Sequence, residues 1–276
     1  MRSYLLAPDR RARSAIRGLG VYTLLVFGTA VAVGACGDDY DDDYPTGSTG
    51  PVPSVVSGAG AIAPKVAEFQ TLLGGAANGS TVGQQASGHR QVNWDGVPAT
   101  ATNTNNFSGA FFNTNVTRGL ITTSPGSGFR VSDNDFGDVN GSDSVGFNPF
   151  SGARTFAPVG SNVMDVTFQV AGAPTPATVT GFAAVFSDVD IFGATKMELF
   201  DKDNRSLGVH LVPARSDAAG FSFLGVKFDA PIVARVRITL GHAAVSATAK
   251  DINDGGTTDL VITDDFFYGE PRAIGS

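Results

Sequence analysis

Apolar runs of strand length, each ended by glycine, proline, asparagine or aspartate, follow one another through most of this chain. The clearest stretch is Gly181–Asp201, in which two runs rich in Val, Phe and Leu flank an Asp-Val-Asp step and a glycine. This pattern is typical of two neighbouring strands. With 35 glycines, 14 prolines and 20 phenylalanines in 276 residues, the composition favours many short strands and tight turns over long helices.

The repeated pattern predicts roughly nine or ten strands with turns about every eight to twelve residues. We therefore expect an all-β fold, a two-sheet antiparallel β-sandwich of the jelly-roll or carbohydrate-binding-module type. Hairpins are expected across the turn Asp201–Asn204 and around Asp229–Pro231, and residues 61–73 fit either a short helix or an entering strand. The expected strands are 91–94, 118–121, 162–170, 178–190, 197–200, 206–212, 221–228, 232–240 and 260–268.

The N-terminus has the layout of a bacterial lipoprotein signal. Five arginines precede an uncharged apolar stretch, Leu19–Ala35, which ends in small residues before Cys36. Cys36 is the only cysteine, so it cannot form an intrachain disulfide, and we expect it to carry the lipid. The alternative is an uncleaved membrane anchor, because the apolar stretch is at the lower limit of length for spanning a bilayer. Either reading places the bulk of the protein outside the cytoplasm, at the bacterial cell envelope.

Three segments follow from this layout: a signal peptide at 1–35, a tether at 36–60 and a single β-sandwich domain at 61–276. The tether opens with five aspartates around Tyr40 and continues through Pro, Gly, Ser and Thr, so it has too few large apolar residues to form a core. Its aspartates fit a solvated spacer, with a cation-binding tag as the alternative. Loss of residues 1–35 takes away five arginines and one aspartate, which changes the net charge from −7 to about −11. So acidic a chain is not expected to bind nucleic acid.

Carboxylates at two strand ends predict a calcium site. Asp188 and Asp190 share one face of an expected strand, and Asp264 and Asp265 follow an apolar run near the C-terminus. Our central hypothesis is that these two acidic strand ends meet in space. Calcium prefers six to eight oxygen ligands, and an extracellular compartment supplies the ion at levels that suit weak sites. The alternative is that each carboxylate caps a turn or pairs with Arg235 or Arg237.

The loops 133–143 and 251–256 are also rich in oxygen ligands. Neither fits the twelve-residue calcium loop of helix-loop-helix proteins, because glycine and the closing glutamate are not at the required positions. Each is expected to be either a solvated turn or a source of cation ligands.

A ligand-binding surface is predicted at Trp94, Asp95 and Tyr268. Trp94 is the only tryptophan and precedes an Asp-Gly turn, where its ring could stack on a sugar or, alternatively, anchor the core. If the domain binds polysaccharide or another surface protein, then Trp94, Phe112, Phe267 or Tyr268 should lie exposed beside polar groups in a groove. If the domain is a structural coat without a small ligand, these rings should be buried.

No catalytic motif stands out. The chain has no Gly-x-Ser-x-Gly elbow, and its three histidines, His89, His210 and His242, lack the spacing of zinc ligands. The remaining enzymatic hypothesis is a carbohydrate-active hydrolase with two carboxylates, in which Asp190 would act with Glu198 or Asp264. If the domain is a non-enzymatic binding module, as we favour, we expect no catalytic residues.

Several motifs together resemble an uncharacterised family of secreted bacterial proteins, of which some are lipid-anchored and others carry sorting tails. The motifs are GHRQVNWDGVPA, the strand from Arg118-Gly119, GFRVS, TVTGFAAVFSDVD, FSFLGVKF, RVRITLG and DDFFYGEP, within residues 60–271. The resemblance implies the compartment and an all-β architecture and implies no reaction. This chain differs from the members with sorting tails, because it has a lipobox instead, that is, the short run of small apolar residues before Cys36.

The sequence thus supports three functional hypotheses. The first is a non-enzymatic binding or adhesion module, held on the envelope by lipid and stabilised by calcium. A structural surface coat without a small ligand is the second, and the two-carboxylate hydrolase is the third.

Overall fold

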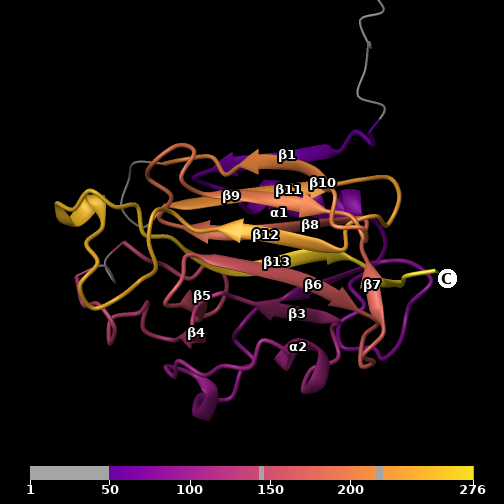
Figure 1. The fold of residues 1–276 in the computed structure, drawn as a ribbon, viewed down its shortest axis with the longest axis horizontal. Coiled ribbons are helices and arrows are strands. Elements are labelled where there is room, and N and C mark those ends of the chain that lie inside the picture. Colours follow the sequence, from indigo (N-terminus) through magenta and orange to yellow (C-terminus); the bar gives the residue numbers. More distant parts are fainter. Residues whose placement is uncertain (1–49, 143–145, 216–219, 276) are drawn as a thin grey trace, which may run out of the picture. The chain divides into compact units, whose positions relative to one another are not determined.

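The structure is a computed structural model that describes residues 50–142, 146–215 and 220–275. The expected lipid-attachment residue Cys36 and the acidic part of the tether lie outside the described residues. Two antiparallel sheets pack face to face, which confirms the all-β two-sheet sandwich (Figure 1). The prediction succeeded because apolar runs of strand length recur between turn residues, and because Val163–Gln169 alternates cleanly between buried and half-buried residues.

Sheet A has the order β1-β11-β8-β13-β5-β4, and β2 pairs with β13 as well. Its strands are β1 (Ser54–Ala59), β2 (His89–Val92), β4 (Gly128–Ser132), β5 (Thr155–Val159), β8 (Gly181–Ser187), β11 (Phe221–Lys227) and β13 (Ile262–Gly269). Sheet B has the order β10-β9-β12-β6-β7-β14, and β3 pairs with β6 as well. Its strands are β3 (Leu120–Thr123), β6 (Val163–Gln169), β7 (Pro176–Thr178), β9 (Lys196–Phe200), β10 (Ser206–Leu211), β12 (Arg235–Thr239) and β14 (Arg272–Ala273).

The two sheets differ in how they are covered. Every residue of β8 and β13 is buried, because sheet A has the sandwich core on one face and the helix α1 (Ala63–Leu73) with neighbouring loops on the other. The ring of Phe69 on α1 lies over Gly225 of β11, where a Cβ would come within 2.5 Å of it. In sheet B, β6 alternates buried and half-buried residues, because its outer face meets solvent. Residues 61–73 therefore contain the helix and not a strand.

Four short helical segments complete the described chain. Besides α1 they are α2 (Phe111–Thr114) and the 3-10 turns Ala99–Ala101 and Ile252–Asp254. No described helix is both long and apolar enough to cross a membrane.

Three expectations about the strands are corrected. The hairpin across Asp201–Asn204 is confirmed as β9–β10, but the one around Asp229–Pro231 is wrong, because β11 lies in sheet A and β12 in sheet B. The two apolar runs of Gly181–Asp201 were expected to be neighbouring strands. They are β8 and β9, which lie in opposite sheets. The body also begins before residue 61, since β1 pairs along its length with β11. Local turn residues do not reveal whether the chain returns to the same sheet or crosses to the other.

Trp94 lies at the centre of the core between the sheets. Its ring stacks on Phe156 at a centroid distance of 3.8 Å, and Phe107, Phe112 and Phe266 pack against it edge-on. Its Nε1 donates a hydrogen bond to the backbone oxygen of Asp264 at 3.1 Å. Only 1% of Trp94 is exposed, so the core-anchor interpretation holds.

Candidate cation site

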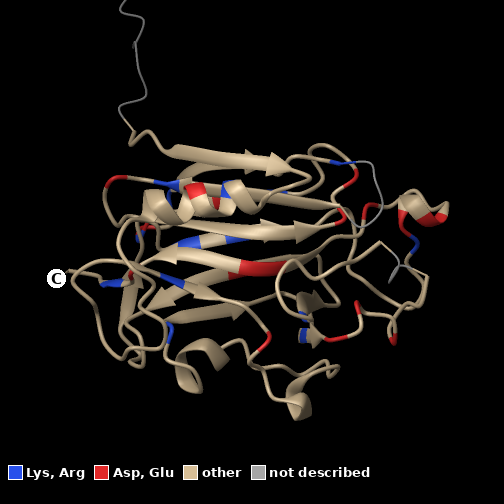
Figure 2. Ribbon diagram, turned by 180° about the vertical axis from the view of Figure 1, so that it is seen from behind, with Lys and Arg blue, Asp and Glu red and all other residues tan. Residues whose placement is uncertain are grey.

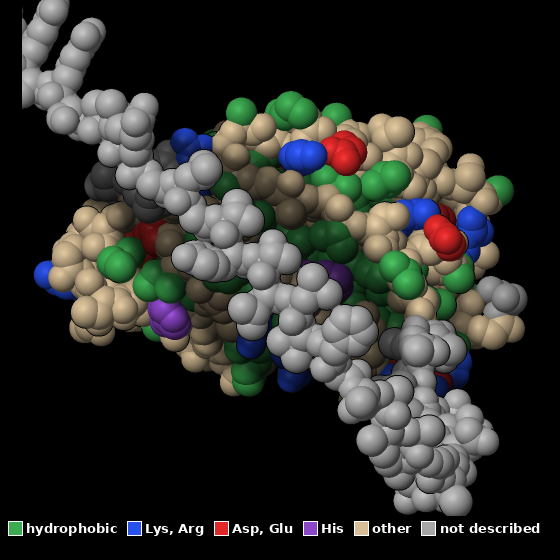
Figure 3. Space-filling model, turned by 90° about the horizontal axis from the view of Figure 1, so that it is seen from above, with side chains coloured by type: hydrophobic (Ala, Val, Ile, Leu, Met, Phe, Trp, Pro, Cys, Tyr) green, Lys and Arg blue, Asp and Glu red, His purple; other side chains and the backbone are tan. Residues whose placement is uncertain are grey.

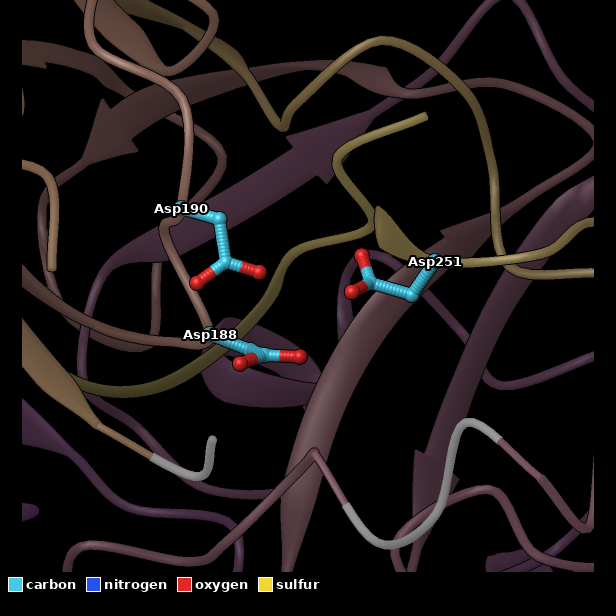
Figure 4. A group of neighbouring side chains, drawn as sticks. All are labelled: Asp188, Asp190 and Asp251. Carbon is cyan, nitrogen blue, oxygen red and sulfur yellow. The ribbon is translucent and has the colours of Figure 1, made fainter. Parts of the chain in front are cut away.

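Three carboxylates converge at one end of the sandwich, and we call Asp188, Asp190 and Asp251 the acidic box. Each offers one oxygen, and these oxygens all lie within 4.8 Å of one another. Figure 4 shows the three side chains pointing toward a common space from two separate segments of the chain. Acidic residues are concentrated in the loops at this end, whereas Asp264 and Asp265 form an acidic stretch inside the central strand β13 (Figure 2).

The end of β8 positions the first two carboxylates. Asp188 follows the last residue of the strand and has a φ of +67°, a left-handed conformation that is uncommon for a residue with a side chain. Its backbone N–H donates to the oxygen of Gly220 at 2.9 Å. The turn leaves Asp188 buried and Asp190 half-buried. A backbone outlier of this kind is found most often where surrounding structure or function requires it.

The loop before β13 positions the third carboxylate. Asp251 accepts hydrogen bonds from the backbone N–H groups of Asn253 at 2.7 Å and Leu260 at 2.9 Å, so it caps the short turn Ile252–Asp254. Asn253 Nδ2 donates to Asp188 at 3.3 Å and to Asp190 at 2.7 Å, which links the two segments. The box is thus fixed by backbone and amide groups.

A fourth carboxylate, Asp259, holds the segment that carries Asp190. It accepts the backbone N–H groups of Asp190 at 3.2 Å and Ile191 at 3.1 Å, and its own N–H lies 3.3 Å from His242 Nδ1. Burial raises the pKa of Asp259, while the two backbone N–H groups act in the opposite direction. Asp259 therefore orients the segment that carries Asp190.

The electrostatics of the box favour a positive partner. Burial raises the pKa of Asp190 to about 6, and the negative charges of Asp251 and Asp259 add to the rise. Asp190 lies close enough to Asp251 for their carboxyl groups to share a hydrogen bond when one is protonated. Among the described residues, no donor group reaches the buried Oδ1 of Asp190. A proton on one carboxylate or a bound cation would relieve the repulsion between these carboxylates.

The structure does not bring all four predicted metal ligands together. Ile262 of β13 pairs with Ser187 at the end of β8, and the strands are antiparallel, so Asp264 and Asp265 lie further back along the sheet, at an irregularity between Thr263 and Phe266. Asp188 and Asp190 are joined by Asp251 instead.

Asp264 and Asp265 hold a different loop. Asp264 Oδ2 accepts the backbone N–H groups of Phe150 and of Ser151, at 2.5 and 3.0 Å, and Asp265 accepts the Ser151 hydroxyl at 2.7 Å. Burial raises the pKa of both carboxyl groups, and the charge of Asp265 raises that of Asp264 further. This pair clamps residues 150–151 onto sheet A.

The predicted ligand-binding residues do not form an open site. Trp94 and Tyr268 are buried, and the Tyr268 hydroxyl donates to the backbone oxygen of Arg118 at 2.8 Å. Asp95 is half-buried and accepts the N–H of Ala153 at 2.9 Å. Trp94 and Tyr268 are therefore corrected to core residues, because burial of a large aromatic ring removes much apolar area from water.

The carboxylate pairs of the hydrolase hypothesis have separate surroundings. Glu198 accepts the Ser206 hydroxyl on the outer face of sheet B, whereas Asp190 interacts with Asn253 and Asp251. Asp264 is enclosed in sheet A.

Sequence reasoning missed Asp251 and Asp259 as members of the site. The available signal was the loop 251–256. Its oxygen-rich composition is visible in the sequence, but the strand end that it packs against is not.

Comparison with protein-family models, with curated proteins and with solved structures finds no match for this chain.

Proposed function

We propose that this protein is a non-catalytic structural module of the bacterial cell envelope, stabilised by a calcium ion at the acidic box. The observation that carries the proposal is the convergence of Asp188, Asp190 and Asp251 within 4.8 Å. Three carboxylates offer up to six oxygens, and backbone carbonyls or water can complete the shell that calcium prefers.

Calcium would add a connection between two segments that hydrogen bonds of Asn253 and Asp259 already join. One segment is the turn after β8, and the other is the loop 251–259 before β13. Both strands lie in the middle of sheet A, so fixing their ends together would stabilise that sheet. An ion would also offset the charges of Asp251 and Asp259, which add to the effect of burial in raising the pKa of Asp190.

The aromatic side chains predicted from the sequence as ligand contacts favour a structural role over recognition by exposed rings, whereas the ring of Phe192 is exposed. Trp94, Phe112, Phe267 and Tyr268 are each at most 5% exposed. A sugar-binding platform requires at least one open ring face. The structural or adhesive module is therefore the preferred form of the proposal.

The proposed location rests on the sequence. A lipid on Cys36 would hold the body outside the cytoplasm through residues 37–49, with an uncleaved anchor as the alternative. Metabolic labelling with a fatty-acid probe tests this: the wild-type chain should take up label and Cys36→Ser should not. Equal labelling of the two would exclude lipidation at Cys36.

The metal content of the purified full chain tests the calcium proposal. After dialysis against calcium and removal of free ion, elemental analysis should find about one calcium per chain. Asp190→Asn and Asp251→Asn should each lose it, while Asp229→Asn, which changes a fully exposed carboxylate, should retain it. A wild-type chain without bound calcium would exclude the site.

A groove of about 720 Å³ supports the binding module as a second candidate function. Apolar residues of its lining include Leu207, Ile232 and Ile274, and charged residues include Lys202 and Arg272. No aromatic residue is among the described lining residues, so a ligand would be held by polar and aliphatic contacts. A glycan array with and without chelator tests this, and Arg272→Ala should abolish any signal that arises in the groove.

A further inference from the structure

Each of the two segments that form the acidic box carries an exposed apolar residue beside its carboxylate. Phe192 follows Asp190 by two residues and is 72% exposed, and Ile252 directly follows Asp251 and is 41% exposed. Phe192 is also the only described phenylalanine that is exposed. Single exposed apolar residues are common on protein surfaces. Two of them at one cation site are a pattern that a ligand explains, and we call Phe192 and Ile252 the apolar tips.

Both apolar tips lie in tight turns that face open space. A backbone hydrogen bond of 3.1 Å closes the first turn and places Phe192 and Gly193 at its centre. The second is the 3-10 turn Ile252–Asp254, which ends at Gly255. A Cβ added at either glycine would meet no atom within 4 Å. Figure 1 shows the turn Ile252–Asp254 projecting beyond the strands at the left of the view.

The two turns belong to one surface because the acidic box joins them. Asn253 of the second turn donates to Asp190 of the first segment at 2.7 Å. Lys250, which directly precedes Asp251, is exposed. At the left end of Figure 3, hydrophobic side chains lie on the surface beside acidic and basic side chains and a histidine. This end of the sandwich thus combines apolar tips, a candidate cation site and an ammonium group.

We propose that this end of the sandwich docks on an anionic phospholipid membrane when calcium occupies the acidic box. Phe192 and Ile252 enter the acyl region below the headgroups, and a lipid phosphate coordinates the ion. The inference rests on the proposed function, because this ion is the one that stabilises the module. The carboxylates supply only part of the six to eight oxygens that calcium prefers, and phosphate oxygens are ligands of the same kind. Lys250 adds attraction to the anionic surface.

The charge of the chain explains why docking requires calcium. Anionic lipids repel a chain with a formal charge of −7, and the carboxylates of the box lie at the docking end itself. A bound calcium ion offsets part of that charge and bridges the box to a phosphate. Two apolar side chains bury too little area to hold a protein on a membrane alone, so the contact depends on both contributions.

The chemistry of this surface favours a membrane over a protein partner. A cation beside apolar tips matches the layering of a membrane, in which anionic phosphates lie directly above acyl chains. The tips project from open turns, and neither is among the described residues that line the groove near Arg272. The lipid expected on Cys36 would also keep the body close to a membrane.

Tryptophan quenching in vesicles tests the docking. The full chain with Phe192→Trp is reconstituted into vesicles of phosphatidylglycerol and phosphatidylcholine whose acyl chains carry bromine, which quenches an indole on contact. Calcium at about 10 mM should lower the emission of the introduced ring by roughly half, and chelator should restore it. The native Trp94 is 1% exposed and should not respond.

Val209→Trp is the matched control, because Val209 is 52% exposed and lies on β10, outside both turns of the box. Its emission should not change with calcium. Equal quenching in the two variants, or no calcium-dependent quenching in Phe192→Trp, would overturn the proposal. Equal quenching of Phe192→Trp in vesicles of phosphatidylcholine alone would overturn the contact with anionic headgroups.

Calcium binding by the wild-type chain gives an independent readout. By linkage, calcium raises membrane affinity by the same factor by which the membrane raises calcium affinity. Equilibrium dialysis should therefore find a half-saturating calcium concentration about fivefold or more lower in anionic vesicles than in detergent. Phe192→Ser combined with Ile252→Ser should lose this gain and still bind calcium in detergent.

The same titrations separate the docking proposal from the calcium proposal. Calcium binding with equal affinity in vesicles and in detergent would overturn the docking and leave the calcium site in place. An equal gain in the double serine variant would also overturn the docking, because the anionic surface would then concentrate calcium without help from the tips. A wild-type chain that binds no calcium in either medium would overturn both proposals.

Discussion

Arg90 and Glu270 form a bidentate ion pair inside the protein, with Nε to Oε2 and Nη2 to Oε1 distances of 2.8 Å. The remaining Arg90 donors reach four backbone oxygens, those of Gly79, Thr81, Gly83 and Thr117. Both side chains are almost fully buried. The pair therefore fixes the loop before β2 to the end of β13.

Removal of one partner should be costly. Glu270→Gln leaves a buried guanidinium without its counter-charge, so we expect a loss of about 3–5 kcal/mol in the free energy of unfolding by urea titration. Arg90→Met should cost a similar amount, and combining Arg90→Met with Glu270→Gln should cost less than the two single losses together. The control is Lys65→Ala, which breaks the exposed pair with Glu68 and should change stability by less than about 1 kcal/mol. A loss for Glu270→Gln as small as that of the control would contradict the role of the pair.

Calcium should raise the thermal stability of the protein. Extracellular calcium sites have dissociation constants of about 0.1–1 mM. At 10 mM calcium, binding to the native state alone then adds about 1.4–2.7 kcal/mol, or roughly 3–10 °C in Tm. Calorimetry with calcium and with chelator measures the shift. Asp251→Asn should abolish it and Asp203→Asn, an exposed carboxylate, should not; an identical shift in both variants would place the effect elsewhere.

The metal-free protein should become less stable as pH rises through neutrality. Burial raises the pKa of Asp190 to about 6 and that of Asp264 to about 8, above the value near 3.9 of an unfolded aspartate. The native state therefore binds more protons than the unfolded state between pH 4 and pH 8, and its stability declines across that window. Urea titrations in chelator at intervals of pH measure the slope. Asp264→Asn should flatten it between pH 6 and 8; an unchanged slope would show that Asp264 ionises normally.

Truncation of Trp94 should remove the centre of the core. Trp94→Ala should lower the free energy of unfolding by about 3–5 kcal/mol, because the ring packs on four phenylalanines and donates to Asp264. Phe192→Ala, at an exposed position, should change it by less than about 0.5 kcal/mol. Because Trp94 is the only tryptophan, its fluorescence should shift to longer wavelength on unfolding. Native emission already typical of solvated indole would contradict the buried position.

The sequence revealed the fold class because its strands carry their pattern locally. The alternation in β6 and the hairpin β9–β10 are visible in the residues themselves. The fully buried β8 was recognised as a strand, but its two-sided burial depends on α1 and on loops far away in the chain. β1, β4 and β5 were not identified as strands, because proline, glycine and serine dilute their apolar pattern.

The candidate site was only half visible. Asp188 and Asp190 could be assigned to one strand end from spacing alone. Their partner Asp251 depends on how the loop 251–259 folds back, and this follows from hydrogen bonds to Leu260 and Asn253 that spacing does not encode. Asp264 and Asp265 are likewise a pair of aspartates and lie close to Asp251 in the sequence. The antiparallel register of β8 and β13 nevertheless separates them from the site.

The position of β13 sets the order in which this molecule can assemble. β13 is the last long strand of the described chain, yet it lies in the middle of sheet A between β8 and β5. During synthesis the earlier strands of that sheet emerge without the neighbour that joins them, and such long-range pairing forms slowly. The nascent chain thus stays open until its C-terminal residues arrive, so that, if the proposed location in the cell envelope holds, an export route that takes only unfolded chains has the whole of that interval in which to act.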